Sequence, residues 1–89
     1  KVQKEWENSY KGLHGKQKIE MAYNIALANE MNNKIKNAQK WVETTISLAS
    51  KKAKYKVLLD QANIYSEILK RRANDYIRLN MQMKAHDNN

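Results

Sequence analysis

The chain has 89 residues, no Cys, no Pro and two Gly, and it carries 17 Lys and Arg against 9 Asp and Glu, a net charge of +8. This composition excludes disulfide frameworks and thiolate metal sites, and two glycines do not suit a Gly-rich phosphate loop or a turn-rich all-β fold. The longest uncharged stretch, residues 21–29, is too short for a transmembrane helix, which needs roughly 20 residues.

Residues 1–11 are predicted to form a short amphipathic helix, because Val2, Trp6 and Tyr10 recur four residues apart. A break is expected at residues 12–15, since two of these four are Gly, the residue that most readily adopts the positive φ at which helices end. The chain begins at Lys1, so a removed leader and a fragment of a longer protein are both open. The sequence indicates no cellular compartment.

From residue 16 onward the chain has neither Gly nor Pro, and apolar residues recur at steps of three and four. This pattern favours one helix over residues 16–49, in which Ala22, Ile25 and Ala26 add a small-residue face that another helix can approach closely. A turn is expected near residues 47–53, where Thr and Ser lower the helix propensity. A second possible turn lies at residues 29–33, because Asn tolerates turn conformations.

A final helix is predicted over residues 51–85, and it has the most regular pattern of the chain. Its apolar seam alternates steps of four and three, as in a heptad repeat, with one polar interruption at Arg72. Arg72 is expected to set the register or to meet a partner's acid there. The seam residues expected at a helix interface are Tyr55, Leu58, Ala62, Tyr65, Leu69, Arg72, Tyr76, Leu79 and Met83.

The predicted fold class is therefore all-α, with a short N-terminal helix and a long antiparallel helical hairpin in a single domain over residues 1–89. One continuous helix within an oligomer is the alternative to the hairpin. Apolar residues on both sides of the seam favour a bundle over a two-stranded coil. Because so short a chain is marginally stable alone, we expect self-association or a partner to complete the fold.

Two basic clusters and two tryptophans are candidates for contact with a partner. Lys and Arg side chains contact phosphates, acidic proteins or anionic membrane surfaces, although solvated or intrahelically paired residues have the same pattern. Trp6 and Trp41 are the candidate surface aromatics. The candidate contacts for an anion, a nucleic acid or an acidic partner are Lys51, Lys52, Lys54, Lys56, Lys70, Arg71 and Arg78.

No catalytic, cofactor-binding or metal-ligating set is predicted, because the histidines, His14 and His86, stand in the break and the tail and the acids lack metal or acid–base spacing. The sequence thus predicts a non-enzymatic helical module that forms homo-oligomers or docks on a larger protein assembly. Nucleic-acid binding by a basic helical scaffold is the alternative function. Contact with a membrane surface, without a transmembrane segment, would use the same basic residues.

The stretch 67–78 of the last predicted helix contains Glu67-Ile68-Leu69-Lys70, Asn74, Tyr76 and Ile77-Arg78. It resembles the closing helix of the UvsY family of phage recombination mediators. The resemblance covers this part of one helix. It implies an oligomeric protein that binds single-stranded DNA as a recombination accessory, which adds to the nucleic-acid interpretation.

Overall fold

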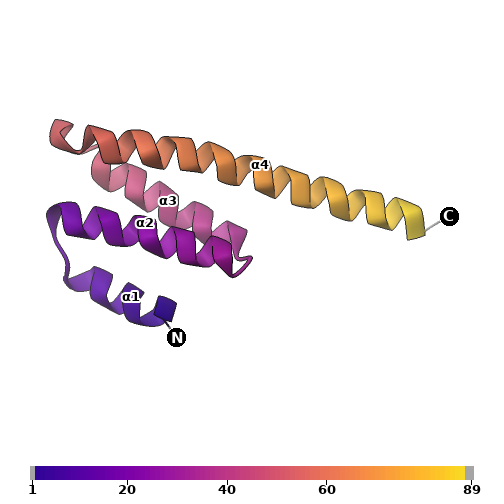
Figure 1. Cartoon of the computed structure of the whole chain (residues 1–89), viewed down its shortest axis with the longest axis horizontal. Coiled ribbons are helices and arrows are strands. Elements are labelled where there is room, and N and C mark those ends of the chain that lie inside the picture. The colour runs from indigo at the N-terminus through magenta and orange to yellow at the C-terminus, as the bar shows by residue number, and fades with distance from the viewer. Residues whose placement is uncertain (1, 88–89) are drawn as a thin grey trace.

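The computed structural model describes the backbone of residues 2–87 and the burial of side chains 4–75 and 77–79. Over residues 2–87 the elements are helices α1 (Val2–Gly12), α2 (Gly15–Met31) and α3 (Ile35–Ala49), the 3-10 turn η1 (Ala53–Tyr55) and helix α4 (Lys56–Asp87) (Figure 1). The predicted all-α fold class is confirmed.

Each helix runs antiparallel to the helix before it, so α4 lies parallel to α2 (Figure 1). α1 packs on α2, while α2, α3 and α4 form a three-helix bundle. α4 has 32 residues against 17 in α2, so at 1.5 Å per residue it is longer by about 22 Å. The radius of gyration of 15.6 Å accordingly exceeds the roughly 12 Å of a compact domain of this length. We call residues 74–87 of α4, which extend past the bundle, the overhang.

The predicted break at residues 12–15 is confirmed, since α1 ends at Gly12 and α2 begins at Gly15. The two glycines differ in what they do. Gly15 has a φ of +61°, and a Cβ atom there would lie 3.4 Å from the hydroxyl of Tyr55. A Cβ atom at Gly12 would have no neighbour within 4 Å among the described residues. Gly15 is therefore the residue whose conformational freedom the junction requires.

Replacing Gly15 by Ala is expected to lower the free energy of unfolding by about 1–2 kcal/mol, because an L-residue in the left-handed region is strained. The matched control is Gly12→Ala, which we expect to leave stability unchanged or slightly higher, since Ala has the better helix propensity. Urea denaturation followed by far-UV circular dichroism measures both. Equal losses in the two variants would contradict the distinction between the glycines.

The helix predicted over residues 16–49 is instead two helices, because the chain turns at residues 32–34. Asn33 has a φ of +63°. The N–H of Lys34 donates to the carbonyl of Asn29 at 2.8 Å, and the N–H of Asn33 donates to the carbonyl of Glu30 at 2.9 Å. This pair of bonds around a left-handed residue is a Schellman motif, for which Asn substitutes when Gly is absent. The turn falls at the second position that the sequence favoured.

The predicted turn near residues 47–53 is confirmed. α3 ends at Ala49, the Ser50 hydroxyl donates to the carbonyl of Ser47 at 3.0 Å, and η1 leads into the last helix. The helix predicted over residues 51–85 therefore begins later, at Lys56, and continues to Asp87.

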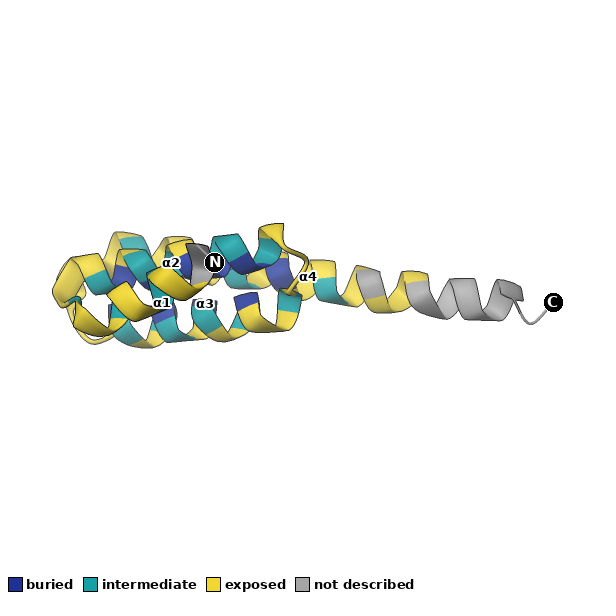
Figure 2. Ribbon diagram, turned by 90° about the horizontal axis from the view of Figure 1, so that it is seen from below, coloured by how far each residue is buried: buried dark blue, intermediate teal, exposed yellow. Residues whose placement is uncertain are grey.

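The core lies where α2, α3 and α4 meet, and Figure 2 shows the buried positions concentrated in this part of the molecule. Small side chains allow close approach of α2 and α3, because Ala22, Ala26 and Ala38 are all fully buried. The expected small-residue face of α2 is thus the face that packs. The central cluster consists of Ala26, Ala38, Val42, Tyr65 and Leu69.

The predicted seam of α4 is inside the bundle along its first half. Ala62, Tyr65 and Leu69 are buried, and Tyr55 and Leu58 are half-buried. Further along, Arg72 and Leu79 are exposed, because α2 has ended at Met31 and α3 begins only at Ile35. The predicted interface residues Tyr76 and Met83 lie outside the residues whose side chains the structure describes.

Candidate interaction surfaces

The predicted basic cluster Lys51, Lys52, Lys54 and Lys56 surrounds the connection from α3 to α4, and all four side chains are exposed. The Nζ atom of Lys54 lies 5.3 Å from the centre of the Tyr55 ring, a cation–π distance. These residues are therefore free to contact solvent or an anionic surface at this end of the bundle.

The fold adds two lysines of α2 to this cluster. Lys16 lines a depression together with Lys54 and Tyr55, and Lys18 lines another with Lys51 and Lys52. Sequence reasoning missed these two because their proximity depends on α2 and α4 being parallel, which no local pattern indicates. We call the resulting group the basic end, which consists of Lys16, Lys18, Lys51, Lys52, Lys54 and Lys56.

The second predicted cluster, Lys70, Arg71 and Arg78, is exposed on α4. The Nζ atom of Lys70 lies 3.3 Å from the carboxylate of Glu67, in a pair whose side chains are 61% and 64% exposed, so this pair contributes little to stability. Arg71 is separated from Lys56 by about 22 Å along the helix. The structure therefore does not bring the two predicted clusters together.

The two tryptophans are half-buried rather than exposed on the surface. Trp41 is half-buried and packs against the central cluster, and its ring meets that of Tyr10 edge-on at 5.1 Å between centroids. Burial raises the pKa of Tyr10 above its ordinary value. Trp6 is also half-buried. Trp41 thus holds α1 onto the bundle, a contact that the spacing of neither residue indicated.

Glu30, near the end of α2, binds two side chains of α4. The hydroxyl of Tyr65 donates to Oε1 of Glu30, and Nη1 of Arg72 donates to Oε2. Burial and, next, the hydrogen bond to Glu30 raise the pKa of Tyr65 above its ordinary value, so the hydroxyl is a donor at neutral pH. Arg72 thus meets a carboxylate of α2 in the same chain, whereas the sequence predicted the acid of a partner.

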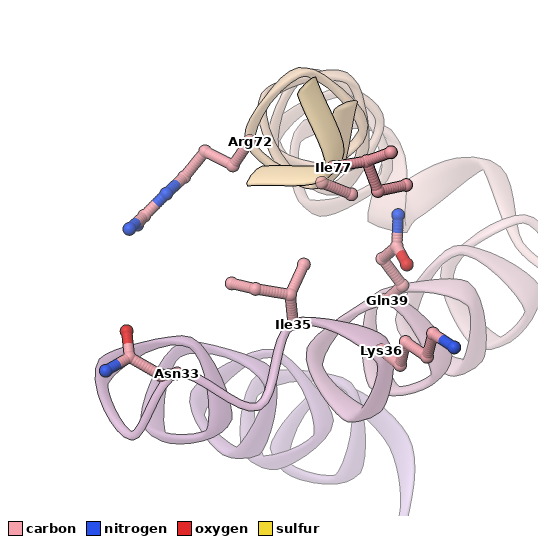
Figure 3. Close-up of a pocket in the computed structure, with 7 residues that line it drawn as sticks. Asn33, Ile35, Lys36, Gln39, Arg72 and Ile77 are labelled. Atoms are coloured by element: carbon pink, nitrogen blue, oxygen red, sulfur yellow. The ribbon is translucent and has the colours of Figure 1, made fainter. Parts of the chain in front are cut away.

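A groove of about 390 Å³, lined on one side by Arg72, lies between the start of α3 and α4. Ile35 and Gln39 point from α3 toward α4, where Ile77 faces them, and the Arg72 guanidinium extends to one side above Asn33 (Figure 3). The apolar lining consists of Ile35, Ala73 and Ile77. The polar lining consists of Asn33, Lys36, Gln39 and Arg72. The groove therefore combines an apolar floor with a cationic rim.

The described residues form neither a metal site nor a membrane span. Among them, no group of three His, Asp or Glu is placed to hold a metal ion. None of their helices has the length and apolar character needed to cross a membrane.

Comparisons with known proteins identify one family. The family model described as DUF6340, a domain of unknown function, matches residues 1–78. No curated protein and no solved structure matches the chain.

Proposed function

We propose that this chain, which belongs to the DUF6340 family, a domain of unknown function, is a non-enzymatic helical module. It assembles with another protein through the end of α4. The proposal covers both self-association and docking on a larger partner. It is supported by the arrangement of apolar residues on α4 and by the exposed basic residues of the same helix.

The observation that carries the proposal is the overhang. Leu79, which continues the seam that is buried in the first half of α4, is 58% exposed, and Ile77, which lies beside that seam in line with Ile64 and Ile68, is 57% exposed. Large apolar side chains exposed past the end of a bundle are candidates for a protein–protein contact. Their exposure does not serve the stability of the bundle, and burial against a partner would account for their position there.

Site-specific photo-crosslinking tests this function in the native host. A photoreactive amino acid at position 79 is expected to give a covalent adduct of defined mass, whereas the same amino acid at Asp60, an exposed position of α4 within the bundle, gives none. An adduct of two copies identifies self-association, and a heavier one identifies a different protein. Absence of an adduct at position 79, or equal adducts at both positions, would refute the proposal.

Nucleic-acid binding is the second candidate function, and the basic end favours it. Six lysines and Tyr55, from the start of α2 and from the connection between α3 and α4, gather there, which suits contact with phosphates and stacking on a base. The discriminating measurement is binding of a short single-stranded oligonucleotide at about 50 mM salt, which under this alternative weakens steeply as salt rises. Binding would then be abolished in a variant with Gln in place of six residues: Lys51, Lys52, Lys54, Lys56, Arg71 and Arg78.

A further inference from the structure

The groove beside Ile77 is shaped for part of an elongated occupant. Its volume of about 390 Å³ lies at the lower end of the range of ligand sites, 300–1,000 Å³. Ile77 is more than half exposed, so the apolar floor continues out of the groove and onto the overhang. A helix that places one or two large side chains between Ile35 and Ile77 would also cover the adjacent surface of α4. Such a helix would pack on α4 beyond the end of α2 and the start of α3.

The charge around the groove is positive. Residues 31–42 contain Lys34, Lys36 and Lys40 and no acid, and all three lysines are exposed. Arg72 stands on the opposite side of the groove. The Arg72 guanidinium is paired with the carboxylate of Glu30, so the net positive charge beside the groove comes from the three lysines. A partner with carboxylates beside its apolar side chains therefore has the complementary charge.

This charge argues against two other occupants. A second copy of the chain also carries a net charge of +8, so two copies repel one another on approach. A nucleic acid would leave the apolar floor of Ile35, Ala73 and Ile77 without a matching surface, and the basic end is the more suitable place for phosphates.

From these observations we infer that the groove is the docking site for an acidic amphipathic helix of a partner protein. Its apolar residues enter the groove between Ile35 and Ile77, and its carboxylates face Lys36 and the lysines on either side of it. This is the helix-in-groove mode of peptide recognition. The inference rests on the proposed function, because it specifies the partner that the end of α4 would bind.

Fluorescence anisotropy with a labelled synthetic peptide tests the inference. The probe is a helix of about 18 residues, five turns, with Leu at the a and d heptad positions and Glu at most others. The wild-type chain is expected to bind it, and Ile77→Glu is expected to weaken binding at least tenfold, about 1.4 kcal/mol. Lys36→Glu, which leaves the apolar floor intact, is expected to weaken binding several-fold and to reduce its dependence on salt.

The matched control is Ile64→Glu. Ile64 is 64% exposed on the same helix and lies about 20 Å from Ile77 along it, so this variant adds the same charge away from the groove and is expected to bind as the wild type does. A second control replaces Lys51, Lys52, Lys54 and Lys56 by Gln at the basic end. Unchanged thermal melting of each variant establishes that it is folded.

Several results would overturn the inference. One is that Ile64→Glu weakens binding as much as Ile77→Glu does. Another is that a peptide with Lys in place of Glu, or with Ser in place of Leu, binds as tightly as the original peptide. A dimer of the chain alone that Ile77→Glu dissociates would show that a second copy is the occupant. If the crosslink at position 79 forms but the probe does not bind, the assembly function stands and the partner class is wrong. If the crosslink fails, the function itself is refuted.

Discussion

Replacing Leu69 by Ala is expected to lower the free energy of unfolding by about 2–5 kcal/mol. Leu69 is fully buried in the central cluster with Ala26 and Ala38, whose side chains are too small to close the space that the substitution leaves. Because the lost packing is combined with a residual cavity, this is the largest single effect that we expect. Domains of ordinary stability have about 5–15 kcal/mol in total, so the variant is expected to lose much of its resistance to urea.

The adjacent residue provides the control for this prediction. Ile68 precedes Leu69 on the same helix and is 45% exposed. Ile68→Ala removes as many carbon atoms as Leu69→Ala does. We expect it to cost less than about 1 kcal/mol, since water already reaches the side chain and the apolar area lost from the interior is small. If the two variants show equal urea midpoints, α4 does not pack on the bundle through the face that contains Leu69.

The second large effect is expected at Glu30, where Glu30→Ala should lower the free energy of unfolding by about 1–3 kcal/mol. Tyr65 is 7% exposed, and its hydroxyl donates to Glu30. Without the carboxylate, the buried hydroxyl loses its acceptor, and its desolvation is no longer offset. The contribution of Arg72 is smaller, because its side chain is 53% exposed and is well hydrated in either case.

Urea denaturation of a double-mutant cycle isolates this interaction. In the Tyr65→Phe background, Glu30→Ala is expected to cost much less, because the hydroxyl that needs an acceptor has gone. Glu67→Ala serves as the matched control: it removes a carboxylate whose pair with Lys70 is exposed, and we expect a change within about 0.5 kcal/mol. A loss at Glu30 that is the same in both backgrounds would mean that the hydrogen bond to Tyr65 is not its cause.

Local pattern was sufficient for much of the fold. Two glycines within four residues predicted the junction of α1 and α2, and a cluster of Thr and Ser predicted the turn that follows α3. The regular seam identified Ala62, Tyr65 and Leu69, which α4 buries, and Leu58, which it half-buries. Each of these features depends on residues that are close in sequence, so periodicity and turn propensity carry the information.

The features that were missed depend on contacts across the chain. The turn at residues 32–34 contains no Gly, and the sequence ranked it second, because the Asn residues there give a weaker signal than the apolar stripe that runs past them; Asn33 adopts a left-handed conformation. The partner of Arg72 is Glu30, 42 positions away, and the lysines of α2 join the basic end only through the packing of helices. The sequence predicts Trp41 as a candidate surface aromatic, because nothing near it in sequence indicates the contact with Tyr10.

The order of packing also determines how this chain folds. α1 packs on α2, α2 on α3, and α3 on α4, with short connections between them, so each successive contact closes only a small loop and the associated loss of chain entropy is modest. Helical proteins dominated by such local contacts fold in microseconds to milliseconds. Leu79 lies beyond the bundle and takes no part in these steps, so substitutions there leave the folding and unfolding rates unchanged. The exposed end of α4 can therefore diversify during evolution without slowing the acquisition of the native state.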